Sequence, residues 1–247
     1  MLEYFLPKGE NIYMKKLKYK LYYERVKKVK IVFYKDSLVD SGTDGDVYYY
    51  KDGCIKIYRN IIPDYSISVL KTIKNISDPN LYCIRNLYYD SKNSVSNVKA
   101  YDMDYYRDEK INILTMPMDY SLDNFNDLCK LAEKISLYKI EINDLHEKNV
   151  IMQSNRFIII DADSWFKRET CDCDFLVAEN YKAVVHLLMR LYYRELVNLG
   201  KIEPLDYNIY DKVLGNLERI KAREIAQELS GYKYPIDYIE AKVNILS

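Results

Sequence analysis

The 247 residues are enough for one large domain or two small lobes with a buried core, and 49% apolar with 30% charged residues is ordinary for a globular chain. Lys plus Arg and Asp plus Glu both number 37, so no global basic field exists to attract nucleic acid. The five cysteines are an odd number, and no run of about 18 apolar residues occurs. We therefore expect a reduced, cytoplasmic protein with neither a nucleic-acid nor a membrane partner.

The first part of the chain has the periodicity of strands. Basic and apolar residues alternate at period two in several places over 15–36, as half-exposed antiparallel strands do. Two β-prone runs over 46–58 are separated by Asp52-Gly53, which predicts a hairpin with a type I′ turn. We expect a short helix over 64–76, after Pro63, and a further strand over 98–106.

From about residue 119 the pattern becomes helical. Apolar side chains recur at three- and four-residue steps between Leu122 and Ile135, which predicts an amphipathic helix. The stretch 174–199 is apolar over much of its circumference and predicts a largely buried helix. Two more helices are expected over 207–229 and 235–246. Strands followed by helices predict the α+β class.

An acidic segment lies between these helices. The runs 150–152 and 156–160 flank a turn-prone Gln-Ser-Asn and predict a small hairpin, which would bring Asp144, Asn149 and Asp161 to one end. Turn and cap roles alone would also explain these residue types. Alternatively, an amide and a carboxylate suit Mg²⁺ shared with substrate phosphates, and a second carboxylate can accept a proton from an attacking hydroxyl. These are the parts needed for phosphoryl transfer.

The spacing favours the chemical interpretation. Asp144 begins Asp-Leu-His-Glu-Lys-Asn, and Asp161 begins Asp-Ala-Asp-Ser twelve residues after Asn149. Both segments resemble the catalytic loop and the metal-binding segment of the protein kinase superfamily, including its aminoglycoside and choline phosphotransferase relatives. The resemblance implies a two-lobed protein kinase-like fold. It would have an antiparallel-sheet N-lobe over 1–103, a hinge at 104–107 and a mainly helical C-lobe over 108–247.

A glycine-containing turn precedes this segment in the chain. Gly42-x-x-Gly45-x-Val47 resembles the latter part of the kinase glycine-rich loop, where small residues let backbone N–H groups approach phosphate oxygens. Lys56 follows nine residues after Val47 in a predicted strand and resembles the lysine that contacts nucleotide phosphates. A solvated strand lysine is the alternative.

The resemblance implies roles for the remaining residues, with ATP and Mg²⁺ as cofactors. Asp144 would be the catalytic base, and Asn149 and Asp161 would hold Mg²⁺ against the ATP phosphates. Met103 and Tyr105 would lie near the adenine, where the backbone of the hinge would supply hydrogen bonds.

Two further residues are given alternatives. Asp163 would either bind the metal as an additional ligand or contact the residues that bind it. His146 would steady the loop rather than act in catalysis.

The chain also departs from the kinase pattern. No Glu occurs between Asn60 and Asn80 to pair with the strand lysine, and the nearest substitute, Asp64, falls at a predicted helix start. Ile142-Asn143 replaces the usual His-Arg before the catalytic Asp, which argues against regulation by activation-loop phosphorylation. Only about ten residues follow Ser164 before the predicted buried helix.

Three functions remain open at this point. The first is an ATP- and Mg²⁺-dependent kinase acting on Ser or Thr of a protein, which the compact C-lobe favours. The second is a phosphotransferase with a small hydroxylated acceptor, which the Asp-Leu-His and Asp-Ala-Asp forms favour. The third is a pseudokinase that binds nucleotide and acts through a protein partner, which the missing helix Glu favours.

Overall fold

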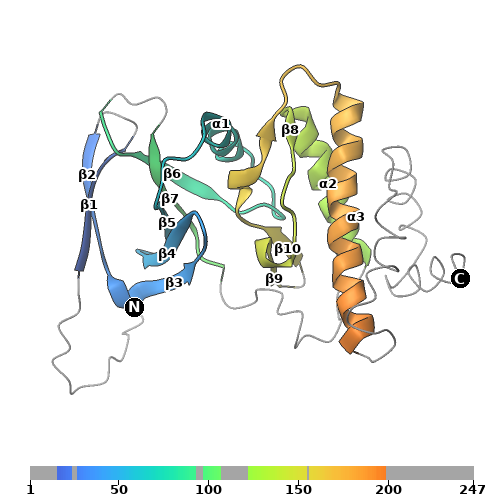
Figure 1. The fold of residues 1–247 in the computed structure, drawn as a ribbon, viewed down its shortest axis with the longest axis horizontal. Coiled ribbons are helices and arrows are strands. Elements are labelled where there is room, and N and C mark those ends of the chain that lie inside the picture. Colours follow the sequence, from blue (N-terminus) through green and yellow to red (C-terminus); the bar gives the residue numbers. More distant parts are fainter. Residues whose placement is uncertain (1–15, 24–26, 93–96, 107–121, 155, 199–247) are drawn as a thin grey trace, which may run out of the picture. The chain divides into compact units, whose positions relative to one another are not determined.

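The computed structural model describes residues 16–23, 27–92, 97–106, 122–154 and 156–198 (Figure 1). The chain forms two compact units, Met1–Ile61 with Leu87–Asp102 and Ile62–Asn86 with Met103–Ser247. The helices expected over 207–229 and 235–246 lie outside the described residues. The boundary expected at the hinge and the observed division both fall near residue 103, but the segment Ile62–Asn86 joins the second unit.

The main sheet of the described chain has seven strands in the order β2-β1-β6-β7-β5-β4-β3. The strands are β1 (Lys16–Tyr23), β2 (Lys27–Tyr34), β3 (Leu38–Ser41), β4 (Gly45–Tyr50), β5 (Gly53–Tyr58), β6 (Ile84–Tyr89) and β7 (Val98–Asp104). A short 3-10 helix, η1 (Lys35–Ser37), connects β2 to β3. The strands expected over 15–36, 46–58 and 98–106 are thereby confirmed.

The alternation in sequence determines which face of β1 and β2 is buried. β1 pairs with β2 in an eight-residue antiparallel register in which Leu21 lies opposite Val29 and Tyr19 opposite Ile31. These residues lie on the face that contacts the core, where the Tyr19 and Phe33 rings stack with centroids 5.7 Å apart. Apolar burial on this one face stabilises the ribbon, and the other face is mostly exposed.

The β4–β5 hairpin has its turn one residue earlier than expected. Tyr50 pairs with Gly53, so the two-residue loop is Lys51-Asp52. Lys51 has a φ of 56°, but Asp52 does not have a positive φ, so the expected type I′ turn, which needs a positive φ at both loop residues, was wrong. The hairpin was therefore predicted correctly, but its turn was misplaced by one residue.

The second unit contains the described α-helices, four short strands and two 3-10 turns. They are α1 (Asp64–Ile73), α2 (Leu122–Leu137), β8 (Ile140–Glu141), η2 (Glu147–Asn149), β9 (Val150–Gln153), β10 (Arg156–Ile159), η3 (Ala162–Ser164), β11 (Phe166–Lys167) and α3 (Cys173–Asn198). Three of the five expected helices, those over 64–76, around 122–135 and over 174–199, and the expected β9–β10 hairpin are confirmed. Among the described residues, none of the helices is both long and apolar enough to cross a bilayer.

The expected kinase-like fold is contradicted. The described chain is rich in sheet: it has three α-helices against eleven strands, and four of those strands lie wholly in the second half, where a mainly helical lobe was expected. β8 pairs with β11 across a separation of more than twenty residues. Such short strands have no periodicity of their own, because long-range pairing creates them. The two-lobed kinase-like fold with a mainly helical C-lobe was therefore wrong.

Candidate functional site

The three residues predicted for phosphoryl transfer all lie in the second unit, around the loop between β8 and β9. The Asn149 side-chain Nδ2 donates to the backbone oxygen of Asp144 at 2.9 Å. The Ile160 N–H donates to the Asn149 carbonyl oxygen, also at 2.9 Å, and Asp161 follows directly. Two hydrogen bonds thus hold Asp144, Asn149 and the residue before Asp161 together. The contact with Asp144 uses the Asn149 amide nitrogen. The amide oxygen, which is the predicted metal ligand, does not take part in that contact.

Asp144 and Asp161 share an uncommon backbone conformation. Their φ angles are 56° and 60°, in the left-handed region that non-glycine residues seldom adopt. Such a conformation costs of order 1 kcal/mol and persists where the surrounding structure imposes it, which happens often at functional sites. The Asp144 side chain is 54% exposed, so its carboxylate is accessible.

His146 connects the two ends of the loop. Its Nδ1 accepts a hydrogen bond from the Lys148 backbone N–H at 3.1 Å. In the neutral ring the hydrogen then resides on Nε2, which lies 3.4 Å from the Asp144 Oδ1. The steadying role expected for His146 stays a prediction.

Asn180 on α3 holds the start of the loop and was missed by the sequence analysis. Its Oδ1 accepts from the Ile142 N–H at 2.6 Å, and its Nδ2 donates to the Ile140 carbonyl oxygen and to Ser136 Oγ. The residue is fully buried at 0% exposure. An asparagine within a helix that is apolar over much of its circumference was the signal available, since a buried amide requires hydrogen-bond partners.

A metal site would be built from few protein ligands. Among the described residues, no cluster of three or more His, Cys, Asp or Glu side chains is placed to hold a metal ion. Asn149 and Asp161 offer one amide and one carboxylate oxygen, which suits Mg²⁺ because this ion commonly takes one or two carboxylates, substrate phosphates and water. Asp163 accepts a hydrogen bond from Ser66 Oγ of α1 on its backbone oxygen at 2.5 Å.

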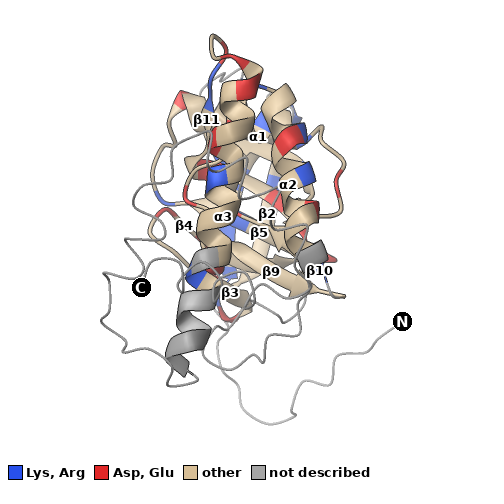
Figure 2. Ribbon diagram, turned by 90° about the vertical axis from the view of Figure 1, so that its right-hand side faces the viewer, with Lys and Arg blue, Asp and Glu red and all other residues tan. Residues whose placement is uncertain are grey.

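A polar pocket of about 300 Å³ lies beside the Asp144 loop. Asp144 and His146 line it from the loop, and α3 contributes Lys182, His186 and Arg190. Figure 2 shows the charged positions along α3. The His186 Nε2 is buried and makes no hydrogen bond to any described group. Burial lowers the pKa of His186, and the neighbouring Lys182 and Arg190 lower it further, so the ring is neutral at pH 7.

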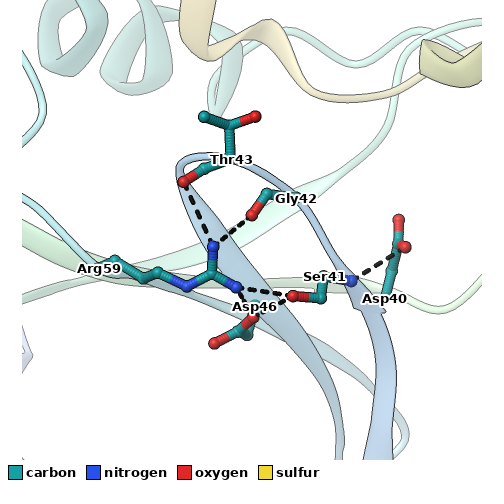
Figure 3. Close-up of polar contacts among 6 residues, drawn as sticks. All are labelled: Asp40, Ser41, Gly42, Thr43, Asp46 and Arg59. Carbon is teal, nitrogen blue, oxygen red and sulfur yellow. Dashed lines mark hydrogen bonds and ion pairs between the residues drawn. The ribbon is translucent and has the colours of Figure 1, made fainter.

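In the first unit, Arg59 holds the glycine-containing turn together (Figure 3). Its guanidinium donates to the Gly42 carbonyl oxygen at 2.5 Å, to Ser41 Oγ at 2.6 Å and to the Asp46 carboxylate. Gly42 N–H in turn donates to the Gly45 carbonyl oxygen at 3.0 Å. These hydrogen bonds fix the turn between β3 and β4 through its carbonyl oxygens. That this turn covers the phosphates of a nucleotide stays a prediction.

Val47 and Lys56 lie directly opposite each other in the β4–β5 ladder, on the same face of the sheet. Lys56 is only 6% exposed, and its ammonium lies 5.5 Å from the centroid of the Tyr58 ring. This burial contradicts the solvated-strand alternative. A buried ammonium requires interactions that offset its desolvation, and the aromatic ring supplies one of them.

The expected hinge carries hydrogen bonds of its own. The Asp104 N–H donates to the Cys83 carbonyl oxygen at 3.3 Å, so this donor is engaged within the second unit. Tyr106 accepts from the Cys83 N–H at 2.9 Å, and burial raises the pKa of Tyr106 to about 12. Met103 and Tyr105 are both half-buried. Arg107 lies outside the described residues.

The predicted site residues thus fall into two groups. Gly42, Gly45, Val47 and Lys56 belong to the first unit, and Met103, Tyr105, Asp144, Asn149 and Asp161 belong to the second. Asp64, the expected substitute for the kinase glutamate, is an exposed residue of the first turn of α1, where it complements the helix dipole. No known family model and no curated protein matches this chain.

Proposed function

We propose that this protein transfers a phosphoryl group from Mg-ATP to a hydroxyl group. The observation that carries this proposal is the pair of hydrogen bonds around Asn149, which joins the backbone at Asp144 to Asn149 and joins Asn149 to Ile160, the residue before Asp161. The proposal rests on this local geometry and on the motif resemblance. It does not rest on the overall fold.

Each residue has a defined part in the proposed reaction. The acceptor oxygen bonds to the γ-phosphorus while the bond from that phosphorus to the β,γ-bridging oxygen breaks, and ADP leaves. Asp144 orients the acceptor hydroxyl and takes its proton. Asn149 and Asp161 would hold Mg²⁺, which neutralises charge on the phosphates when bound. Lys56 belongs to the first unit, and the phosphate contact that the resemblance implies for it stays a prediction.

The pocket beside Asp144 favours a small polar acceptor over a Ser or Thr side chain of a protein. Its volume of about 300 Å³ is at the lower end of the range for small-molecule sites. Its lining mixes the Asp144 carboxylate with Lys182, His186 and Glu179, which can donate to or accept from hydroxyl groups. A hydroxylated molecule with several polar groups would satisfy these side chains.

Thermal unfolding tests the nucleotide part of the proposal. We expect Mg-ATP at about 100 times its Kd to stabilise the full chain by about 2.7 kcal/mol, seen as a raised Tm. EDTA should remove much of this shift, and Asp161→Asn should reduce it by weakening the metal site. Asp174→Asn, an exposed carboxylate at the start of α3, is the matched control. An equal shift in wild type and Asp161→Asn would contradict the assignment of Asp161.

A further inference from the structure

One face of the β1–β2 ribbon carries a concentrated positive charge. The antiparallel register places opposite residues of the two strands on the same face. On this basic face lie Lys16, Lys18, Lys20 and Tyr22 of β1, opposite Tyr34, Val32, Lys30 and Lys28 of β2. All five lysines are exposed, and Val32 and Tyr34 are 40% and 44% exposed. No acidic residue belongs to this face of the two strands.

The opposite face of the same ribbon packs on the hydrophobic core. Leu21, Ile31 and Phe33 are buried there. The basic face is therefore fixed in place by the core beneath it. The equal totals of 37 basic and 37 acidic residues do not reveal the positive charge of the basic face. This local asymmetry is the reason to depart from the expectation, drawn from total charge, that nucleic acid is not a partner.

Protection of a sheet edge explains only part of the pattern. β2 is an edge strand, and lysines on an edge strand discourage pairing with another chain. β1 pairs with β6 only at Tyr22 and Tyr23, so in the described register its stretch Lys16–Leu21 pairs with β2 alone, and lysines there discourage further pairing as well. Edge protection does not require five lysines on one face without an acidic residue, and an anionic partner would reduce the repulsion between these like charges.

We propose that the basic face binds single-stranded nucleic acid through its phosphates. The lysines are flexible point charges without the planar geometry for reading base edges, so binding would be independent of sequence. Tyr22 and Tyr34 stand at opposite ends of the face, about 20 Å apart at a strand rise of 3.4 Å per residue, where bases can stack on them. This inference is independent of the proposed phosphoryl transfer.

Fluorescence anisotropy of a fluorescein-labelled 20-residue oligothymidylate tests the proposal with the full chain. We expect binding that weakens with salt, with log K against log[salt] falling at a slope no steeper than about −3.5 for five neutralised phosphates on a single strand. A triple Lys18→Gln, Lys20→Gln, Lys30→Gln variant should bind at least tenfold more weakly, with the slope reduced by about 2.

Two matched variants make the test specific. The triple variant Lys27→Gln, Lys51→Gln, Lys92→Gln removes the same charge at exposed positions off the basic face and should change affinity less than twofold. Tyr34→Ala should weaken binding without changing the salt slope. All substituted side chains are exposed, so unchanged Tm values confirm that each variant is folded.

Three outcomes would overturn the proposal. The first is an equal loss of affinity in the two triple variants, which would show that only total charge matters. The second is tighter binding to a duplex of the same length than to the single strand. The third is lysine-dependent binding to phosphatidylserine vesicles without binding to oligothymidylate, which would assign the face to a lipid surface.

Discussion

At the scale of single residues, the two glycines of the β3–β4 turn have different environments. A Cβ on Gly45 would lie 2.5 Å from the Ile57 carbonyl oxygen, a backbone atom that cannot move without disturbing the β4–β5 pairing. A Cβ on Gly42 would meet nothing closer than 3.9 Å. The motif alone makes the two glycines equivalent, whereas the structure assigns a packing constraint to Gly45 only.

We therefore expect Gly45→Ala to lower the free energy of unfolding by about 1–3 kcal/mol, as overpacking does. Gly42→Ala should change it by less than about 0.5 kcal/mol, because nothing crowds the added methyl group. Urea denaturation of both variants measures the difference. Equal effects of the two substitutions would show that the close contact with Ile57 does not constrain the hairpin.

The same turn should respond to acid through Asp46. The Ser41 hydroxyl and then the Arg59 guanidinium hold the pKa of Asp46 below its ordinary value. Since the pKa is lower in the folded state, the resulting stability is present above the unfolded carboxyl pKa of about 3.9 and is lost as pH falls through the folded pKa. Asp46→Asn should therefore be less stable than wild type at pH 7. The two unfolding midpoints should converge as the pH falls from the unfolded carboxyl pKa of about 3.9 through the lower folded pKa, and a difference that does not shrink over this fall would contradict this account.

At the scale of elements, α3 positions the candidate site through Asn180. We expect Asn180→Ala to destabilise the second unit by about 3 kcal/mol, because it strips the buried Ile142 N–H and Ile140 carbonyl of partners. Asn75→Ala is the control: this exposed side chain donates to the Lys71 carbonyl oxygen, and its loss should cost less than about 0.5 kcal/mol. Urea denaturation measures both, and similar costs would contradict a positioning role for Asn180.

Elements with a strong local signal were predictable from sequence, and those made by distant pairing were not. The apolar spacing from Leu122 to Ile135 correctly predicted α2, and the β9–β10 hairpin followed from its turn residues. β6 (Ile84–Tyr89) was missed; it lies between β7 and β1, and its paired residues on β1 are more than sixty positions away in the chain. The arrangement of Asp144 and Asn149 followed from the motif. The contribution of Asn180 depends on a contact between α3 and the loop that no local pattern encodes.

At the scale of the whole molecule, the chain resembles kinases in short motifs but not in its fold. The segments from Asp144 to Asp161 resemble a phosphotransferase loop, and the hydrogen bonds at Asn149 support that role. The sheet-rich architecture nevertheless differs from the mainly helical second lobe that the same resemblance implied. A few residues at fixed spacing specify a local loop, whereas the arrangement of strands depends on the rest of the chain.

The central claim is that Asp144 and Asp161 carry phosphoryl transfer. The measurement that tests it most directly is ADP formation from γ-labelled Mg-ATP, with choline, an aminoglycoside, glycerol and casein supplied as acceptors. We expect wild type to form ADP and labelled product. Asp144→Ala should retain the Tm shift with Mg-ATP but react about 100-fold more slowly, and Asp161→Ala should lose both. ADP formation by wild type no faster than by the two variants would contradict the claim.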